Sequence, residues 1–475
     1  MPLADLRTFL QTLDKYGELK TLRGVDPQNE IGAITEVSIQ KDGPALLFEA
    51  IPGYAPNNRV VANVCSTPRR GLLAFGMDPD MPEEEATRRY RELTDKYKPV
   101  APKVVESAAF MENVETGDDI DLLQIPVPLW HELDGGPYIG TGVAVIHQDP
   151  DTRAVNVGCY RVQLHDRNTT GLFTEPESDG RQIMEKYWAQ GKPAPVAISF
   201  GPEPLLFLSA CSGNGSPKGP YEYEFTGYIS GEPVPVMRGP VTGLPISAGS
   251  EIVIEGEVPP PDQETRIEGP FGEWTGYYEA SQTMEPVVHV KALYYRNDPI
   301  LFGAPPLQNK RSYSLALNVR SGGMVSRFAQ MELPVRRTAS IVPLGCTVIT
   351  VEQQHPDDVK RIMDVLEKGY NPSRLTILVD DDVDPTDPWD VLWAVGTRFD
   401  PEDSRMSTVQ SRWLLDPLRP MEHRSSRQPQ PYKRMIINGC RPFDRIAEFP
   451  PVNRFSEDRR QAVWNKWAMA DWLTR

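Results

Sequence analysis

A series of short β segments between residues 120 and 300 constrains the fold of this chain more than any other feature. Branched residues alternate with polar ones in these segments, and Gly/Pro turns separate them, which is typical of half-buried strands. The clearest examples are residues 138–147, 154–165, 195–201 and 251–258. One helix is expected among them, at about 180–190. Many short strands with turn signals predict a barrel or a sandwich, and such a barrel can carry a ligand.

The pattern changes in the C-terminal part of the chain. Residues 346–354 predict a strand, 356–369 a helix and 374–381 a second, almost wholly apolar strand. A strand, a helix and a buried strand in this order form a βαβ unit with a parallel, right-handed crossover. Asp387 then caps a further helix that has Pro388 at its first position. This region is therefore expected to be a separate α/β domain.

Helices are also expected at both ends of the sequence. The first, at about residues 4–16, is indicated by apolar residues at helical spacing: Leu6, Phe9, Leu10 and Leu13. The last begins after Ser456, a plausible cap. It carries three tryptophans: Trp464, Trp467 and Trp472. A helix with this many tryptophans is expected to dock either on its own domain or on a second subunit.

Charge and hydropathy exclude two classes of partner. Lys and Arg total 50 whereas Asp and Glu total 66, so the formal net charge is −16. A surface this acidic repels phosphate backbones, so we expect no nucleic-acid partner. No apolar run approaches the roughly 20 residues of a membrane helix, and the first residues lack the pattern of a secretion signal. We therefore expect a cytoplasmic protein without a membrane partner.

Cysteine and histidine spacing exclude two further kinds of site. Five cysteines are scattered singly, and an odd number without a CxxC pair fits reduced thiols better than a disulfide framework. The cysteines are Cys65, Cys159, Cys211, Cys346 and Cys440. None of the six histidines stands in HxH, HExxH or HxxxH spacing, so a histidine-rich zinc site is not indicated. Oxygen ligands would have to hold most of any metal.

The most distinctive segment is EGPFGEWTGYY, which runs from Glu268 to Tyr278. Its first two glutamates, Glu268 and Glu273, are separated by a Gly-Pro-Phe-Gly turn that can aim both carboxylates into one pocket. A flat strand would not do so at an odd spacing. Two nearby carboxylates in different environments are a common acid/base arrangement. The alternative is an ordinary strand turn whose glutamates face solvent.

The second distinctive segment is NVGCYRVQ, at residues 156–163. Arg161 lies in a predicted buried strand and needs an anionic partner there, which Glu268 or Glu273 could supply. Asn156 and Arg161 are an odd number of residues apart, so they line one site only if the strand bulges or ends near Gly158. The alternative is an edge-strand arginine that faces water.

Oxygen-bearing residues form two candidate cation sites. Asn156, Glu222 and Asp179 offer the hard ligands that Mg²⁺ or Mn²⁺ prefers. A second candidate is the aspartate run of the C-terminal region: Asp380, Asp381, Asp382 and Asp384. Because this run lies between a buried strand and a helix cap, a solvated turn is the favoured interpretation.

Taken together, the segments NVGCYRVQ, EYEFTG (residues 222–227) and EGPFGEWTGYY resemble the UbiD family of reversible decarboxylases. The similarity covers essentially the whole chain, from ADLRTFL through EGPFGE and TGYY to LVDDDVDPTDPWDVLWAVGTR. It implies an α+β protein whose central unit, residues 116–310, is a flavin-reductase-like split β-barrel that binds prenylated FMN. It also implies an N-terminal α/β region at 1–115, a linker helix at 311–335 and a C-terminal α/β oligomerisation domain at 336–475. That last domain includes the terminal helix and would form the dimer.

The resemblance also implies roles for individual residues. Arg161, Glu268 and Glu273 match the family's Glu-Arg-Glu network, in which Glu273 would be the proton donor. Arg161 and Glu268 would orient the cofactor and the acid. Asn156 and Glu222 match two ligands of a divalent metal that bridges the cofactor phosphate. Many relatives supply a histidine as the third ligand, but the corresponding stretch here has none, and we expect Asp179 in its place.

Further cofactor contacts and partners follow from the same resemblance. Cys159, Tyr160 and Arg161 fall on the stretch that contacts the flavin, and Lys368 matches a cofactor-contacting lysine. The metal is expected to be Mn²⁺ or Mg²⁺, with K⁺ as a further candidate ion. A flavin prenyltransferase would supply the cofactor. The family implies a homodimer or a higher homo-oligomer.

The implied activity is the non-oxidative, reversible decarboxylation of an aromatic, heteroaromatic or α,β-unsaturated carboxylic acid. Loss of CO₂ from such an acid leaves a carbanion that side chains cannot stabilise alone, so an electrophilic cofactor must act as a covalent electron sink. Candidate pocket walls are Trp274, Leu307, Phe328 and Met331, and core packing is the alternative for each of them.

Two other functions are weighed against this one. A flavin-dependent oxidoreductase on the same barrel would need no paired glutamates, so Glu273→Gln should spare it. A non-catalytic assembly protein is the third possibility. The intact set of Arg161, Glu268 and Glu273 argues against that third possibility.

Overall fold

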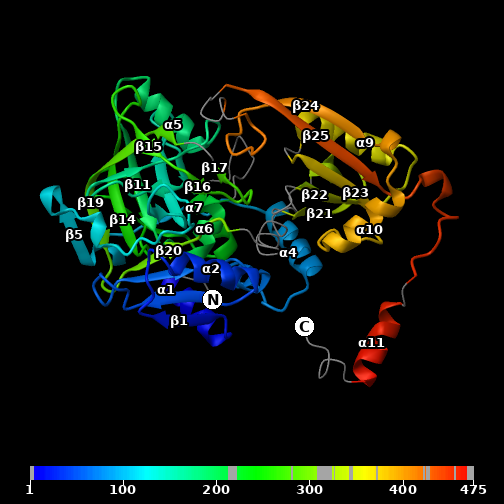
Figure 1. Cartoon of the computed structure of the whole chain (residues 1–475), viewed down its shortest axis with the longest axis horizontal. Coiled ribbons are helices and arrows are strands. Elements are labelled where there is room, and N and C mark those ends of the chain that lie inside the picture. The colour runs from blue at the N-terminus through cyan, green and yellow to red at the C-terminus, as the bar shows by residue number, and fades with distance from the viewer. Residues whose placement is uncertain are drawn as a thin grey trace.

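The computed structural model describes residues 5–211, 222–279, 282–307, 324–325, 327–341, 346–370, 373–420, 423, 428–453 and 456–467. These residues form a mixed α/β protein with three main sheets (Figure 1). A four-stranded sheet belongs mainly to the N-terminal part, a seven-stranded sheet to the central part and a five-stranded sheet to the C-terminal part. The expected combination of helices with several sheets is therefore confirmed.

The N-terminal sheet has the strand order β1-β2-β3-β20. Its strands and the nearby helices are β1 (Leu19–Arg23), β2 (Ala45–Glu49), β3 (Arg59–Ala62), β20 (Ile300–Gly303), α1 (Leu6–Lys15), α2 (Ile31–Gln40), α3 (Pro68–Ala74) and α4 (Glu83–Asp95). Helix α1 confirms the expected opening helix. Asp5 caps it by accepting a hydrogen bond from the Thr8 backbone N–H at 2.8 Å. Gly17 follows with a φ of +71°, a conformation that favours glycine.

The central sheet has the order β10-β19-β14-β11-β7-β8, with β5 also paired to β19. Its strands are β5 (Asn113–Thr116), β7 (Val143–Gln148), β8 (Val155–Gly158), β10 (Thr169–Gly171), β11 (Ala194–Phe200), β14 (Ile252–Val258) and β19 (Val287–Tyr295). All neighbouring strands in it are antiparallel. In the described part of the chain, the edge strands β8 and β10 do not pair with each other, so a closed barrel is not observed.

Shorter elements surround this sheet and carry most of the candidate site. They are β4 (Lys103–Val104), β6 (Tyr138–Gly140), β9 (Val162–Gln163), β12 (Pro235–Arg238), β13 (Pro245–Ser247), β15 (Arg266–Glu268), β16 (Phe271–Gly272), β17 (Tyr278–Glu279), β18 (Thr283–Glu285), α5 (Asp179–Trp188), α6 (Pro204–Ala210) and α7 (Glu222–Ser230). The strands expected at 195–201 and 251–258 are confirmed as β11 and β14, and the helix expected at 180–190 as α5.

Two expected strands are each interrupted in the structure. The stretch 138–147 divides into β6 and β7, and the stretch 154–165 divides into β8 and β9. The second break follows Gly158, the position where the strand would have to end if Asn156 and Arg161 line one site, and the Tyr160 ring occupies the space that a side chain on Gly158 would need. The chain between β8 and β9 is thus free of ladder pairing, and this is the stretch that carries Arg161.

Strand β7 shows how the central sheet is covered on both faces. Val143 and Val145 belong to the apolar core that also contains Phe48 and Val60 of the N-terminal sheet. The alternating residues, Ala144 and Ile146, belong to a second apolar cluster. Because successive strand residues point to opposite faces, β7 is buried on both sides. A strand packed in this way is a rigid support for the loops at its ends.

The C-terminal sheet has the order β21-β22-β23-β25-β24. Its elements are β21 (Val335–Ile341), β22 (Cys346–Val351), α9 (Asp358–Val365), β23 (Leu375–Asp380), α10 (Pro388–Arg398), β24 (Arg405–Ser411) and β25 (Gln430–Gly439). Strands β22 and β23 are parallel with α9 between them, which confirms the predicted βαβ unit. Asp387 accepts a hydrogen bond from Trp389 N at 2.9 Å, which confirms the predicted cap. Helices α9 and α10 cover opposite faces of this sheet (Figure 1).

The terminal helix α11 (Glu457–Lys466) is present, but its tryptophans are exposed. Trp464 and Trp467 keep 39% and 64% of their surface, so their packing within the described chain is slight. Figure 1 shows the helix standing away from the C-terminal sheet. Trp472 lies outside the described residues. None of the described helices is long and apolar enough to cross a bilayer.

The expected domain bounds remain predictions. The linker helix expected at 311–335 lies mostly outside the described residues, and β21 already begins at Val335. Strand β20 falls within the expected unit 116–310 yet pairs with β3 of the N-terminal sheet. The N-terminal and central parts therefore share a sheet as well as a core.

Candidate active site

One arginine binds two glutamates from a distant segment. Arg161 contacts Glu268 through two parallel hydrogen bonds, from Nε to Oε1 at 2.8 Å and from Nη2 to Oε2 at 2.7 Å. Its Nη1 donates to Glu273 Oε1 at 2.6 Å. The alternatives of a water-facing arginine and solvent-facing glutamates are wrong, because Glu268 keeps only 1% of its side-chain surface and Glu273 only 9%.

The turn between the two glutamates is held by a third segment. Glu268 ends β15 and Glu273 follows β16, so only Gly269 and Pro270 lie between the two strands. Gly135 N donates to Pro270 O at 2.8 Å, and a side chain at Gly135 would clash with the Gly269 carbonyl. This close approach requires glycine at position 135 and fixes the turn against the protein.

His131 and Asp134 support the same turn, although no motif or spacing in the sequence points to them. Asp134 Oδ1 accepts a hydrogen bond from Gly272 N at 3.0 Å, directly before Glu273. The His131 ring bonds to Asp134 through Nδ1 at 2.9 Å and to the Pro306 carbonyl through Nε2 at 2.8 Å. The ring also packs where a side chain on Gly272 would lie. The pair therefore fixes the backbone that presents Glu273.

Two aromatic residues complete the surroundings of Arg161. The Tyr138 hydroxyl donates to Glu268 Oε1 at 2.7 Å, and the Phe173 ring lies 3.8 Å from the guanidinium carbon. Burial raises the pKa of Tyr138, so its hydroxyl remains a donor. Sequence reasoning missed both residues, because neither carries a spacing signal toward positions so distant in the chain.

The two carboxylates occupy different electrostatic environments. Glu268 receives three hydrogen bonds, two from Arg161 and one from Tyr138, which favour its charged form. Glu273 receives one from Arg161 and one from the Trp274 backbone N–H. Burial raises the pKa of Glu273, although the charge of Arg161 opposes the rise. Such a pair can hold a proton on Glu273 while Glu268 stays ionised.

The residues expected to hold a metal lie around the end of β8. Glu222 Oε2 accepts a hydrogen bond from Val157 N at 3.0 Å. Burial raises the pKa of Glu222 to about 7, and the charge of Asp179 adds to the rise. The Asn156 Nδ2 atom is buried without a hydrogen-bond partner in the described part of the chain. Asp179 is exposed in the first turn of α5.

These residues fit a cation. The buried Glu222 carboxylate, whose charged form is disfavoured, and the nearby Asp179 carboxylate would both gain from a bound divalent ion. The Asn156 side-chain oxygen could join them, because the unpartnered atom of that amide is its nitrogen, which cannot bind a cation. Within the described residues, no group of three or more His, Cys, Asp and Glu side chains is assembled for a metal. Asparagine is not one of these four residue types, so a site completed by the Asn156 oxygen is compatible with this absence.

The stretch expected to contact a flavin and Lys368 lie in different parts of the structure. Cys159 and Tyr160 lie beside Arg161, and Gly180 N donates to the Tyr160 hydroxyl oxygen at 3.1 Å. Lys368 is exposed in the π-helical turn Leu366–Tyr370 that follows α9. The described residues show no contact between Lys368 and the Arg161 network. The structure therefore brings together the central residues but not Lys368.

The aspartate run of the C-terminal domain binds arginines instead of a cation. Asp380 is buried and accepts hydrogen bonds from Arg398 at 3.1 Å and from Arg441 N at 2.6 Å. Asp382 binds Arg398 at 2.7 Å. A solvated turn is thus wrong for Asp380, because arginines from other elements fold over the end of β23.

The four residues expected as candidate pocket walls lie in different surroundings. Trp274 stacks on Trp413, with ring centroids 5.6 Å apart. Leu307 is buried, and Phe328 lies within the apolar core beneath α9. Met331 is exposed. Core packing therefore explains Phe328, whereas Trp274 adjoins Glu273 and remains a candidate wall.

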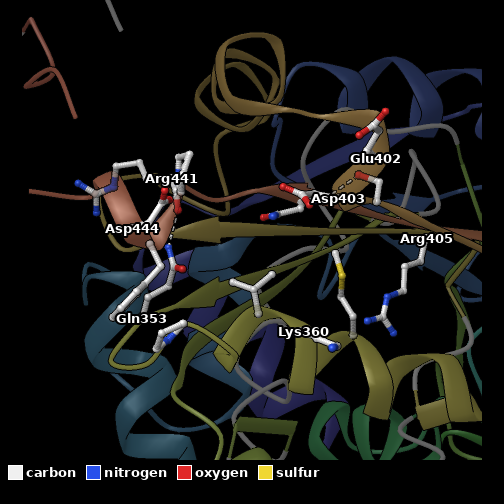
Figure 2. A pocket seen from close by; sticks show the side chains of 14 residues that line it. Gln353, Lys360, Glu402, Asp403, Arg405, Arg441 and Asp444 are labelled. Carbon is white, nitrogen blue, oxygen red and sulfur yellow. Dashed lines mark hydrogen bonds between the residues drawn. The ribbon is translucent and has the colours of Figure 1, made fainter. Parts of the chain in front are cut away.

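A separate pocket of about 380 Å³ opens in the C-terminal domain (Figure 2). It lies beside α9 and the ends of β22 and β25, and its charged lining residues include Lys360, Glu402, Asp403, Arg405, Arg441 and Asp444. Arg405 already binds Glu367 at 2.9 Å, and Arg441 binds Asp380 at 3.2 Å. None of the expected site residues lines this pocket.

Three protein-family models match consecutive parts of the chain. Models described as the N-terminal, Rift-related and C-terminal domains of 3-octaprenyl-4-hydroxybenzoate carboxy-lyase match residues 10–93, 103–308 and 335–439. The chain belongs to the UbiD family. This confirms the resemblance seen in the sequence and makes the protein a carboxy-lyase of the UbiD type.

Two curated UbiD relatives match most of the chain. A phenolic acid decarboxylase from Streptomyces sp. (strain D7) is 32% identical over 425 residues, which cover 85% of this chain and 86% of the relative. A pyrrole-2-carboxylic acid decarboxylase from Pseudomonas aeruginosa is 32% identical over 432 residues, which cover 86% of each chain.

Solved UbiD structures have the same architecture. The vanillic acid decarboxylase of Sedimentibacter hydroxybenzoicus, in its open form, has a TM-score of 0.81 at 27% identity and covers 98% of this chain and 99% of its own. An evolved dimeric form of the UbiD-class enzyme HmfF from Pelotomaculum thermopropionicum, in complex with prFMN, has a TM-score of 0.80 at 25% identity. It covers 99% of this chain and 100% of its own.

Proposed function

We propose that this chain catalyses the non-oxidative, reversible decarboxylation of an aromatic, heteroaromatic or α,β-unsaturated carboxylic acid, with prenylated FMN as its cofactor. The observation that carries the proposal is the buried network in which Arg161 binds Glu268 and Glu273. Support comes from UbiD membership, from two relatives named as decarboxylases of aromatic acids and from a structural neighbour described with prFMN.

Glu273 is the proposed proton donor. Prenylated FMN, when bound, supplies the electron sink for the carbon that loses CO₂. Glu273 then delivers a proton to that carbon, since burial raises its pKa and Arg161 donates one hydrogen bond to it, against two to Glu268. Arg161 fixes both acids, and Glu268 holds the guanidinium in place through its paired bonds.

Cofactor and metal contacts are proposed for the residues around the end of β8. Asn156, Glu222 and Asp179 would hold Mn²⁺ or Mg²⁺, and K⁺ is a further candidate ion. Asn156, Cys159, Tyr160, Arg161 and Glu222 would face the cofactor. Lys368 stays a prediction from the sequence resemblance. The open central sheet would correspond to the split barrel of the flavin-binding unit.

The proposed partners follow from the chemistry. The substrate is a small carboxylic acid, and a flavin prenyltransferase would supply the cofactor. A homodimer or higher homo-oligomer would cover the exposed Trp464 and Trp467 of α11.

The test uses protein co-produced with a flavin prenyltransferase and the same protein produced without it. Each is incubated with a panel of aryl, heteroaryl and acrylic acids, and CO₂ and the decarboxylated product are quantified. We expect turnover of at least one acid by the co-produced protein alone. Equal turnover by both preparations would refute the requirement for prenylated FMN. Hydride transfer without CO₂ release would indicate a flavin oxidoreductase instead.

A further inference from the structure

Two of the five cysteines lie side by side at the edge of the candidate site. Cys159 follows β8, and Cys211 follows α6, so the two come from separate elements. The Cys159 backbone N–H donates to the Ala210 carbonyl at 3.3 Å, which joins the two segments directly. The Cys159 thiol lies within hydrogen-bonding reach of the Cys211 thiol, and its Sγ also lies 4.0 Å from the Thr141 carbonyl oxygen.

The remaining cysteines are chemically different from this pair. Burial raises the pKa of Cys65 and Cys346 to about 12, and it raises the pKa of Cys440 well above the usual range. The hydrogen bond from Cys211 lowers the pKa of Cys159 instead, although burial and the charge of Glu273 oppose this effect. A low thiol pKa is what makes a cysteine nucleophilic.

The two members of the pair are suited to different roles. Cys211 is exposed and stands at the C-terminal end of α6. Cys159 is half-buried and would be the thiolate. An oxidant from solvent can approach the pair from the Cys211 side.

We propose that Cys159 and Cys211 form a dithiol that hydrogen peroxide converts reversibly into a disulfide. The Cys159 thiolate attacks one peroxide oxygen, so an S–O bond forms, the O–O bond breaks and hydroxide leaves. The Cys211 thiol then attacks the sulfenic acid; the S–S bond forms, the S–O bond breaks, and its proton leaves with the hydroxyl group as water. Two thiols are oxidised and one peroxide is reduced.

Oxidation of this cysteine pair would affect the candidate active site, because Cys159 lies close to Arg161 in the chain. Cys159 lies two residues before Arg161, in the unpaired stretch between β8 and β9. A disulfide would tie that stretch to the end of α6. The proposal goes beyond the proposed decarboxylation, and its test does not depend on that activity.

The test treats the native full-length protein with one equivalent of hydrogen peroxide. Remaining thiols are alkylated, and unreduced tryptic peptides are analysed by mass spectrometry. We expect the peptide 154–161 linked to the peptide 187–218, a fall in titratable thiols of the denatured protein from five to three, and recovery of all five with dithiothreitol.

Two variants control the measurement. Cys211→Ser should lose the linked peptide, whereas Cys65→Ser should keep it and fall from four thiols to two. Because Cys211 is exposed, its replacement should leave the fold intact. Five unreacted thiols, a link between other cysteines, or sulfinic acid at Cys159 without a link would each overturn the proposal.

Discussion

Trp274 stacks on Trp413, with ring centroids 5.6 Å apart and planes inclined by 24°. The first residue directly follows Glu273, and the second lies in the C-terminal domain, after β24. A hydrogen bond from Leu414 N to Glu175 Oε2, at 3.3 Å, joins the same two parts of the chain. The C-terminal domain is thus docked on the segment that presents the proposed proton donor.

Replacing Trp413 with alanine should loosen this docking. The stacked pair contributes about 0.5–1.5 kcal/mol beyond the buried area of the rings. We expect Trp413→Ala to lower kcat while flavin binding is retained, because Glu273 loses the support of its neighbour. Trp389→Ala is the matched control, since Trp389 is a highly exposed tryptophan of the same domain. Equal kinetic effects of the two variants would contradict the prediction.

Glu273→Gln should abolish turnover without loss of cofactor. The amide keeps the shape of the side chain but cannot deliver a proton, and a general acid typically contributes a factor of about 10²–10⁴. The measurements are the rate of product formation, the absorbance of bound cofactor and the exchange of solvent deuterium into product. Deuterium exchange at the wild-type rate would exclude Glu273 as the donor.

Activity should depend on the protonation of Glu273. Burial raises its pKa above the usual 4.5, so the acid form persists at higher pH than for an exposed glutamate. The donor must be protonated, so kcat should be highest below this raised pKa and fall as pH rises through it. The contribution of Glu273 to folding stability changes with pH in the same direction. It is complete below pH 4.5 and is lost as the pH rises through the raised pKa. A kcat profile that falls already below pH 4.5 would contradict this assignment.

Glu222→Gln should weaken binding of a divalent metal. Glu222 is the buried carboxylate of the proposed site, and removing its charge leaves only Asp179 and a neutral amide as ligands. We expect at least a roughly tenfold loss of Mn²⁺ affinity in titration calorimetry. Glu224→Gln, two residues along the same helix, serves as the control and should bind Mn²⁺ normally. Unchanged affinity in Glu222→Gln would remove Glu222 as a ligand.

Asp134→Ala should destabilise the turn that precedes Glu273. The substitution leaves Gly272 N and the His131 ring without their acceptor, at a cost of about 1–3 kcal/mol for an unsatisfied buried group. Denaturant unfolding measures this loss, and kcat should fall with it. Asp151→Ala, at an exposed turn, should change neither quantity. A wild-type kcat in Asp134→Ala would show that the turn holds Glu273 without Asp134.

Local signals predicted the regular elements well. The opening helix, the cap at Asp387 and the βαβ unit of residues 346–380 appear as expected, because each depends on local sequence patterns. The long strand expected at 154–165 is wrong, since the packing of Tyr160 on Gly158 interrupts it. That interaction depends on the local fold of the loop and not on alternation of polar and apolar residues.

The sequence alone determined the family, the order of the elements and which arginine and glutamates to consider, because motif residues and periodicity are written along the chain. Only the tertiary structure decided that Arg161 meets both acids, that Tyr138 and Asp134 support them and that Trp413 packs beside Glu273. These contacts join segments far apart in the chain, and their geometry is set by how the sheets pack and where their loops end. No local pattern encodes that packing.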